Sequence, residues 1–212
     1  MILAIVAVGR QYIDNAKMYI PKYIQRGWDV RVLTDETESF PNIKTYKYSN
    51  KVFSYIDKLL FSLRLVEELK QPVLYIDADW IDFISDELIS NFKQTNEVLY
   101  FGNWPGGKYF SDNHKQYFKP LLTYFKKNNF EYNKLLTMLE YVHFFPYISN
   151  IADVIYDLER IKPIFDYQSI IKKTYFYPKI GNGEGVALSY TLYKNNIPTK
   201  LFDSKYFLEN AK

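Results

Sequence analysis

The chain has 212 residues, of which 48% are hydrophobic and 24% charged, and this composition is typical of one ordinary α/β domain with its own core. No stretch reaches the roughly 18 consecutive apolar residues that a membrane-spanning helix needs, so no transmembrane segment is expected. A net charge of +3 is too small to indicate a nucleic-acid partner, and the absence of cysteine excludes disulfides and thiolate metal sites. Without cysteine or a secretory signal pattern, we expect a cytoplasmic protein.

The first thirty-five residues show the pattern strand, helix, strand. Ile2–Val8 is a continuous aliphatic run that ends at Gly9, which is typical of a parallel strand buried on both faces. Helical spacing follows over Ile13–Gln25, and Asp29–Asp35 has the alternation of a second strand. Since crossovers between parallel strands are right-handed, these residues predict the opening of a doubly wound α/β sheet.

The next part of the chain predicts two further strands and two helices. A polar, tyrosine-rich connection follows Pro41, and apolar residues then recur at helical spacing from Ser54 to Leu69. Val73–Ile76 is the next predicted strand, Asp86–Phe92 a short helix, and Glu97–Phe101 a further strand. The strands again alternate with helices, as a mostly parallel sheet requires.

The C-terminal half predicts mainly helices. Residues Lys115–Tyr141 are compatible with a long helix, and Pro146 interrupts the segment that follows. Further helices are predicted over Ile151–Arg160 and Val186–Lys194, and Pro198–Phe202 has the pattern of a final short strand. No internal repeat or linker divides the chain.

The sharpest chemical feature is an aliphatic strand that runs directly into Asp77 and Asp79. Ligands of open α/β sheets bind outside the carboxyl ends of the strands, so the two carboxylates lie where a site is expected. Residues two apart in an extended segment point the same way, which lets both face one hard cation and hold it against a diphosphate. The alternative is that one aspartate caps a turn and the other is merely solvated.

The segment Val73-Leu-Tyr-Ile-Asp-Ala-Asp-Trp80 resembles the strand and Asp-x-Asp motif of GT-A glycosyltransferases, especially glycosyltransferase family 8, which includes glycogenin and lipopolysaccharide galactosyltransferases. The resemblance implies a single GT-A domain over residues 1–212, with a nucleotide-sugar donor half (1–101) and an acceptor half (102–212). It also implies a hexosyltransferase-like enzyme that uses a nucleotide-sugar donor, expected to be a UDP-sugar, and Mn²⁺ or Mg²⁺ bound by Asp77 and Asp79.

The helix before this strand carries a candidate phosphate ligand. Lys58 occupies the place where these enzymes have a basic residue that approaches the donor diphosphate, so the resemblance implies that role for it. A plain surface lysine is the alternative. Arg64 falls on another face of the same helix and is expected to pair with an acid such as Glu68.

The ends of the first two strands lie where GT-A enzymes hold the base and ribose of the nucleotide. Val8, Gly9, Arg10 and Asp35 are therefore candidate donor-binding residues, and Gly9 would permit close backbone approach. Arg10 either contacts phosphate or lies on the surface, and Asp35 either bonds the nucleotide or starts the loop.

The C-terminal segment Gly183–Phe202 resembles the acceptor-side helix and strand of the blood-group type transferases, glycosyltransferase family 6. There a glutamate precedes the helix at the reacting carbon, and Glu184 occupies the matching place, so Glu184 and Asp79 are the candidate catalytic residues. A carboxylate at this position could stabilise an oxocarbenium-like centre, act as a nucleophile, or orient the acceptor hydroxyl. A glutamate favoured by the helix dipole is the alternative.

The two histidines, His114 and His143, lie in no metal-ligand pair. Family 8 enzymes usually supply a further metal ligand from a late histidine motif, which this chain lacks after His143. Either another group completes the metal shell, or Asp77, Asp79 and the diphosphate hold the ion.

Two other functions fit parts of the sequence. A haloacid-dehalogenase-like phosphatase also has an Asp-x-Asp at a strand end, and a non-catalytic module could bind a nucleotide sugar without turnover. The acceptor stays open among glycan, lipid-linked, protein and modified nucleic-acid substrates, and so does the oligomeric state. Retention of the anomeric configuration is implied by families 6 and 8, but inverting GT-A enzymes share the motif.

Overall fold

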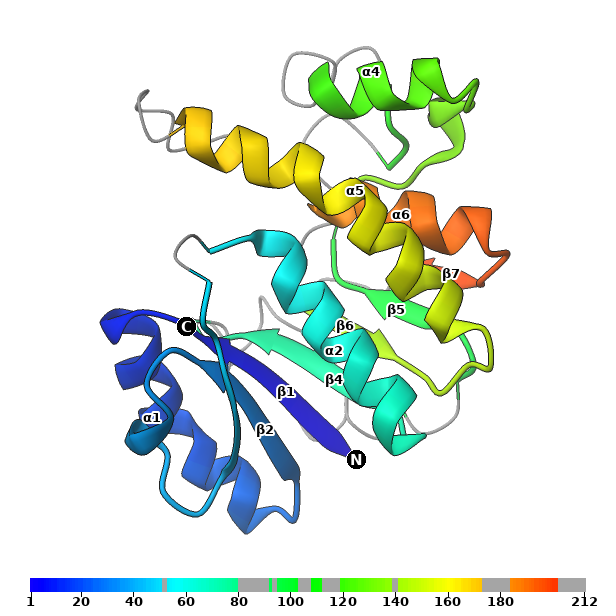
Figure 1. The fold of residues 1–212 in the computed structure, drawn as a ribbon. Coiled ribbons are helices and arrows are strands. Elements are labelled where there is room, and N and C mark those ends of the chain that lie inside the picture. Colours follow the sequence, from blue (N-terminus) through cyan, green and yellow to red (C-terminus); the bar gives the residue numbers. More distant parts are fainter. Residues whose placement is uncertain are drawn as a thin grey trace.

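The computed structural model describes residues 1–50, 53–79, 92, 95–102, 108–111, 119–138, 141–172 and 184–201, which build a seven-stranded sheet with the order β3-β2-β1-β4-β6-β5-β7 (Figure 1). The strands are β1 (Ile2–Ala7), β2 (Asp29–Thr34), β3 (Lys44–Lys47), β4 (Val73–Asp77), β5 (Val98–Tyr100), β6 (Val142–Phe145) and β7 (Thr199–Leu201). Strand β6 is antiparallel to both neighbours, and the other neighbouring pairs are parallel.

Helices cover both faces of this sheet (Figure 1). The described helices are α1 (Arg10–Gln25), α2 (Tyr55–Leu69), α4 (Lys119–Lys127), α5 (Ile151–Lys172) and α6 (Glu184–Lys194), with short 3₁₀ turns η1 (Thr37–Ser39) and η4 (Tyr132–Lys134). The α/β fold class expected from the sequence, a mostly parallel sheet flanked by helices, is thereby confirmed. None of the described helices has the length and apolar character to cross a bilayer.

Strand β1 shows why the sheet is buried on both sides. Its side chains alternate between two hydrophobic cores, as the twofold period of a strand requires. Ile2, Ala4 and Val6 pack into the core under α2, α5 and α6, whereas the intervening residues pack into the core under α1. The continuous aliphatic run therefore serves two faces at once.

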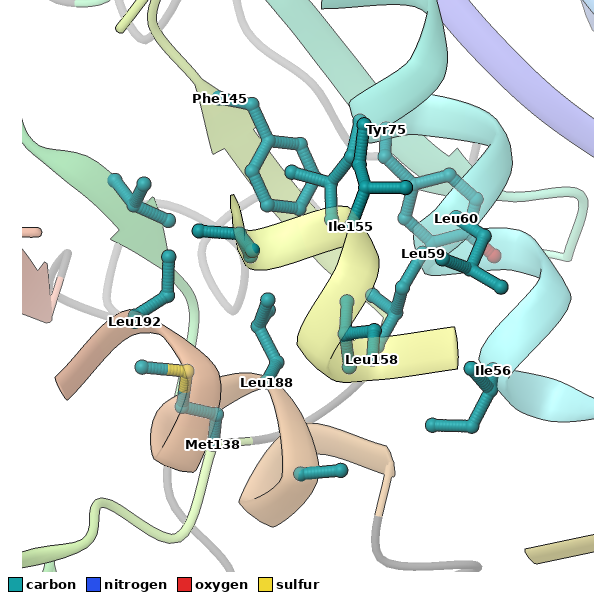
Figure 2. Close-up of a cluster of buried hydrophobic side chains, with 14 of the residues drawn as sticks. Ile56, Leu59, Leu60, Tyr75, Met138, Phe145, Ile155, Leu158, Leu188 and Leu192 are labelled. Carbon is teal, nitrogen blue, oxygen red and sulfur yellow. The ribbon is translucent and has the colours of Figure 1, made fainter. Parts of the chain in front are cut away.

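Helix α6 lies deep in the larger core, where residues 184–192 are all buried. Figure 2 shows Leu188 of α6 between Leu158 of α5 and Met138, with Leu192 on the other side of Met138 from Leu158. A Cβ on Gly185 would lie only 2.1 Å from the backbone carbonyl oxygen of Met138. Glycine is therefore required here so that the first turn of α6 can approach the chain at Met138.

We predict that Gly185→Ala destabilises the fold, because the added methyl forces α6 away from Met138. Overpacking of this kind costs about 1–3 kcal/mol, which urea unfolding monitored by circular dichroism would detect. Ala187→Gly, two residues further along the same helix, serves as the comparison. It removes a buried methyl group from α6 and creates no clash with Met138. An unchanged midpoint for Gly185→Ala would mean that the close approach is absent.

Three elements differ from the sequence predictions, and one of them is β6 (Val142–Phe145), an antiparallel strand that was not predicted before Pro146. The long helix predicted over Lys115–Tyr141 is wrong in its second half, because α4 ends at Lys127: Asn129 takes a left-handed backbone (φ 51°), and the Phe130 N–H donates to the Phe125 carbonyl at 2.9 Å. Within the predicted tyrosine-rich connection, Lys44–Lys47 forms the edge strand β3, which pairs parallel with β2.

The remaining predicted elements lie close to the observed ones, with α5 running twelve residues past the predicted end at Arg160 to Lys172. The helix predicted over Asp86–Phe92 lies outside the described residues apart from Phe92. Trp80 and His114 also lie outside them.

Candidate functional site

Three charged side chains from three elements meet beside the carboxyl end of β4. Lys58 lies in the first turns of α2, Asp77 ends β4, and Glu184 begins α6. The Lys58 ammonium Nζ lies 3.3 Å from both carboxylate oxygens of Asp77 and 3.3 Å from Oε1 of Glu184. One ammonium group therefore joins two carboxylates that come from opposite halves of the chain.

The cluster is largely removed from solvent. The side chains of Lys58 and Glu184 are 5% and 3% exposed, whereas that of Asp77 is 21% exposed. Lys58 is thus not the surface lysine that the sequence left as an alternative. Of the three side chains, only Asp77 keeps appreciable contact with solvent. Asp77 therefore lies between the buried pair and the solvent at the edge of the sheet.

Aromatic side chains complete the surroundings of this cluster. The Tyr75 hydroxyl donates to Oδ1 of Asp77, and the Tyr75 ring centroid lies 5.8 Å from Nζ of Lys58. The ring of Tyr55, one turn before Lys58 on α2, lies 5.5 Å from the same nitrogen. Ring faces and the two carboxylates thus surround the ammonium group, and both kinds of neighbour favour its charged form.

Burial perturbs the ionisation of both carboxyl groups. Desolvation raises the pKa of Asp77 above its ordinary value, and the positive charge of Lys58 partly opposes the shift. Desolvation likewise raises the pKa of Glu184, again opposed by Lys58 and increased by the negative charge of Asp77. Two carboxylates share one ammonium group, so full ionisation leaves an excess negative charge.

One carboxylate oxygen of this cluster is buried without a donor in the part of the chain that the structure describes. Among the described residues, none donates a hydrogen bond to Oε2 of Glu184, although this atom is buried. A buried carboxylate oxygen without a donor is costly unless a ligand or water satisfies it. Among the described residues, Lys58 thus contacts one oxygen of Glu184, and no donor reaches the other.

Asp79 follows Asp77 by two residues and is exposed. Tyr12, near the start of α1, lies close to both aspartates. Burial raises the pKa of the Tyr12 hydroxyl, and the negative charges of Tyr55, Asp79 and Asp77 raise it further. Asp79 and Asp77 therefore lie at the same edge of the sheet as Tyr12 and Tyr55.

The ends of β1 and β2 are joined by a hydrogen bond. The backbone N–H of Gly9 donates to Oδ1 of Asp35 at 3.0 Å. Gly9 has φ 90° and ψ 148°, a conformation essentially restricted to glycine, and Val8 beside it is half-buried. Asp35 thus fixes the backbone turn that leads from β1 into α1.

Arg10 and Arg64 both make surface ion pairs. Arg10 is 69% exposed and lies 3.2 Å from Asp14 and 3.7 Å from Glu36. The expected pairing of Arg64 with Glu68 is wrong, because its guanidinium lies 2.5 Å from Glu159 of α5, which packs beside α2. As predicted, Arg64 does not share the face of Lys58.

His143 is buried in β6, between the rings of Tyr75 and Phe145, which stack on it at centroid distances of 6.4 and 5.7 Å. Desolvation lowers the pKa of His143 to about 3, with a smaller contribution from Lys58, so the ring is neutral. Within the described part of the chain, neither ring nitrogen has a hydrogen-bond partner. His143 therefore packs as an aromatic core residue.

A divalent cation fits this edge only together with a ligand. Among the described residues, no group of three or more His, Cys, Asp and Glu side chains forms a metal-ligand set. Asp79 is exposed, whereas Asp77 already contacts Lys58 and Tyr75. Mg²⁺ is usually held by one or two carboxylates plus substrate phosphates, and Asp79 with Asp77 beside it matches that requirement.

Three tyrosines near this site were not predicted from the sequence. Tyr75 lies two residues before Asp77, and Tyr55 three residues before Lys58, so each shares a face with a predicted site residue by simple periodicity. Tyr12 carries no such signal, because it reaches the site through the packing of α1 against the sheet.

No protein-family model matches the chain, and no curated protein sequence matches it. The fold is similar to that of 4-diphosphocytidyl-2C-methyl-D-erythritol synthase from Anaerococcus prevotii, with a TM-score of 0.47 and 11% identity over 96% of this chain and 88% of the other. It is also similar to galactosyltransferase LgtC in complex with donor and acceptor sugar analogs, with a TM-score of 0.42, 12% identity, and coverage of 94% and 73%.

A third similar structure is a glycosyltransferase involved in glycosylation of the major capsid of PBCV-1, with a TM-score of 0.40 and 11% identity over 96% of this chain and 83% of the other. Likeness at this level concerns the general course of the chain. It says nothing of which side chains at the strand ends bind a ligand.

We predict a pH-dependent effect of Glu184→Gln on stability. A carboxyl group with a raised folded pKa makes the folded state lose stability as pH rises from the unfolded pKa through the folded one. The melting temperature of Glu184→Gln, relative to the native chain, should therefore increase between about pH 4 and pH 8. Differential scanning fluorimetry across this range measures the difference.

Asp153→Asn serves as the control, because Asp153 is an exposed acid in the first turn of α5. This substitution removes one acidic side chain from the surface, and so distinguishes the general loss of a negative charge from the loss of the buried Glu184 carboxyl. A pH-independent difference for Glu184→Gln would contradict the raised pKa of this group.

Proposed function

We propose that the chain is a glycosyltransferase that moves a sugar from a nucleotide-diphosphate sugar, expected to be a UDP-sugar, to an acceptor hydroxyl. The observation that carries the proposal is the meeting of Lys58, Asp77 and Glu184 beside the carboxyl end of β4. Donor-side and acceptor-side candidates from separate parts of the sequence converge there. Ligands of open α/β sheets bind at this edge.

In this proposal the donor diphosphate lies beside Asp79 and Asp77, which hold a Mn²⁺ or Mg²⁺ ion. The ion, when bound, neutralises the negative charge that develops on the departing nucleoside diphosphate. Lys58 keeps Asp77 in place by direct contact. The turn joined by Gly9 and Asp35 lies at the same edge and is suited to the nucleoside, with Val8 and Arg10 beside it.

Glu184 is proposed to act at the reacting carbon. Lys58 holds Oε1, which leaves Oε2 as the atom that faces a bound substrate. A carboxylate there can stabilise positive charge on the sugar ring or orient the acceptor hydroxyl. Because Lys58 contacts both Asp77 and Glu184, the same ammonium group would set the distance between donor and reacting centre.

We predict that UDP-sugars raise the melting temperature only when Mn²⁺ is present, because a ligand of the native state stabilises it by mass action. A donor at one hundred times its Kd would add about 2.7 kcal/mol. Asp79→Ala should abolish the metal-dependent shift, whereas Asp153→Ala, at the start of α5 and away from the strand ends, should keep it. A thermal-shift screen of nucleotide sugars measures all three proteins.

Glu184→Gln separates binding from turnover in the same assay. It should keep the donor-induced shift but lose metal-dependent release of UDP from the donor, which a coupled UDP assay measures. A native chain that binds the donor without releasing UDP would support the non-catalytic module instead. If no nucleotide sugar changes the melting temperature, the proposal is wrong.

A further inference from the structure

A cavity of about 390 Å³ opens near β5 and β7, outside the cluster of Lys58, Asp77 and Glu184. Five segments contribute residues to its wall: β5, residues 108–109, residues 134–136, α6 and β7. Its side chains include three lysines and three tyrosines, which are Lys108, Lys134, Lys200, Tyr100, Tyr109 and Tyr193. These segments are far apart in the sequence, so only the folded chain brings these lysines and tyrosines together.

The charged side chains that line this cavity are all basic. None of the described residues that line it is acidic. Lys134 has a partner at the rim, since its Nζ lies 2.9 Å from Oε2 of Glu131. Lys108 and Lys200 form no ion pair with any described acid, so their charges attract an anion into the cavity.

The tyrosines supply surfaces of a different kind. Tyr109 and Tyr193 are 52% and 45% exposed, although both are large aromatic residues. Exposed rings with a polar hydroxyl combine an apolar face and a hydrogen-bonding group, which suits the mixed surface of a sugar ring. Nζ of Lys108 lies 5.3 Å from the Tyr109 ring centroid, so charge and ring face the same space.

The cavity lies at the same edge of the sheet as the proposed donor site. Tyr100 and Leu201 end β5 and β7, which run parallel to β4, so they share its carboxyl edge. In the sheet register, Tyr75 faces His143, which faces Tyr100. Tyr100 therefore lies two strand spacings, roughly 10 Å, from Tyr75, whose hydroxyl contacts Asp77.

Helix α6 connects the two places directly. It begins with Glu184, and the same rigid helix contributes Ser189 and Tyr193 to the cavity wall. We propose that this cavity holds the acceptor of the transfer reaction, and that the acceptor is an anionic saccharide, with sugar rings that carry a phosphate or carboxylate group. The inference rests on the proposed function, since it assigns the second substrate of the same reaction.

The test uses glucose 6-phosphate and neutral methyl glucoside as probes, titrated into the full chain while protein NMR shifts are followed. Glucose 6-phosphate should bind more tightly than methyl glucoside, and its binding should weaken as salt is added. The double variant Lys108→Gln/Lys200→Gln should weaken it by roughly tenfold or more, since each removed ammonium loses a charge-assisted contact. Lys17→Gln/Lys44→Gln, on α1 and β3, removes the same charge elsewhere and should leave binding unchanged.

Three results would overturn the inference: equal affinity for both probes, unchanged affinity in Lys108→Gln/Lys200→Gln, or a short oligonucleotide that binds these lysines more tightly than the sugar phosphate. Asp79→Ala separates the two proposals, because it should abolish donor binding and leave glucose 6-phosphate binding intact. Loss of glucose 6-phosphate binding in Asp79→Ala would mean that the probe occupies the donor site. A native chain that binds the UDP-sugar but not glucose 6-phosphate would leave the donor proposal standing and remove this one.

Discussion

The ammonium group of Lys58, shared by the carboxylates of Asp77 and Glu184, is the interaction on which the candidate site depends. It joins α2, β4 and α6 at one point, so these elements cannot shift independently near the carboxyl edge of the sheet. Buried ion pairs contribute little net stability, because desolvation offsets the attraction between the charges. A cluster with one cation for two acids is better explained by function than by stability.

The surrounding structure serves to bring Glu184 into this cluster. Helix α6 is buried along its first nine residues, and Gly185 allows its first turn to lie against the backbone of Met138. The hydrophobic face of α6 then packs against α5, which lies between α6 and α2 (Figure 2). The packing energy of the apolar core thus compensates for the burial of an acid that is unfavourable by itself.

Much of the N-terminal part of the candidate site could be predicted from the sequence because its signals are local. The apolar periods of the sequence predicted the helix that carries Lys58 and the strand that runs into Asp77, whereas the resemblance to GT-A glycosyltransferases implied that Lys58 approaches the donor diphosphate. The contact between Lys58 and Glu184 could not be predicted in this way, since it depends on how α6 packs. The edge strand β3 was missed because its four residues carry no apolar alternation.

The end of α4 was also missed, although Asn128 and Asn129 mark it, because the segment beyond contains good helix formers such as Leu135, Leu136 and Met138. The basic cavity near β7 draws on Lys108, Lys134 and Lys200 from distant segments. Only the tertiary fold assembles such a set, and a net charge of +3 gives no sign of it.

The most direct measurement of the central contact is a double-mutant cycle between Lys58 and Glu184 in urea unfolding at neutral pH. Lys58→Met alone should cost about 3–5 kcal/mol, because it leaves two buried carboxylates without their cation. Adding Glu184→Gln should recover part of that loss, with a coupling energy of at least about 1 kcal/mol. Additive effects, within about 0.5 kcal/mol, would show that Lys58 and Glu184 do not interact.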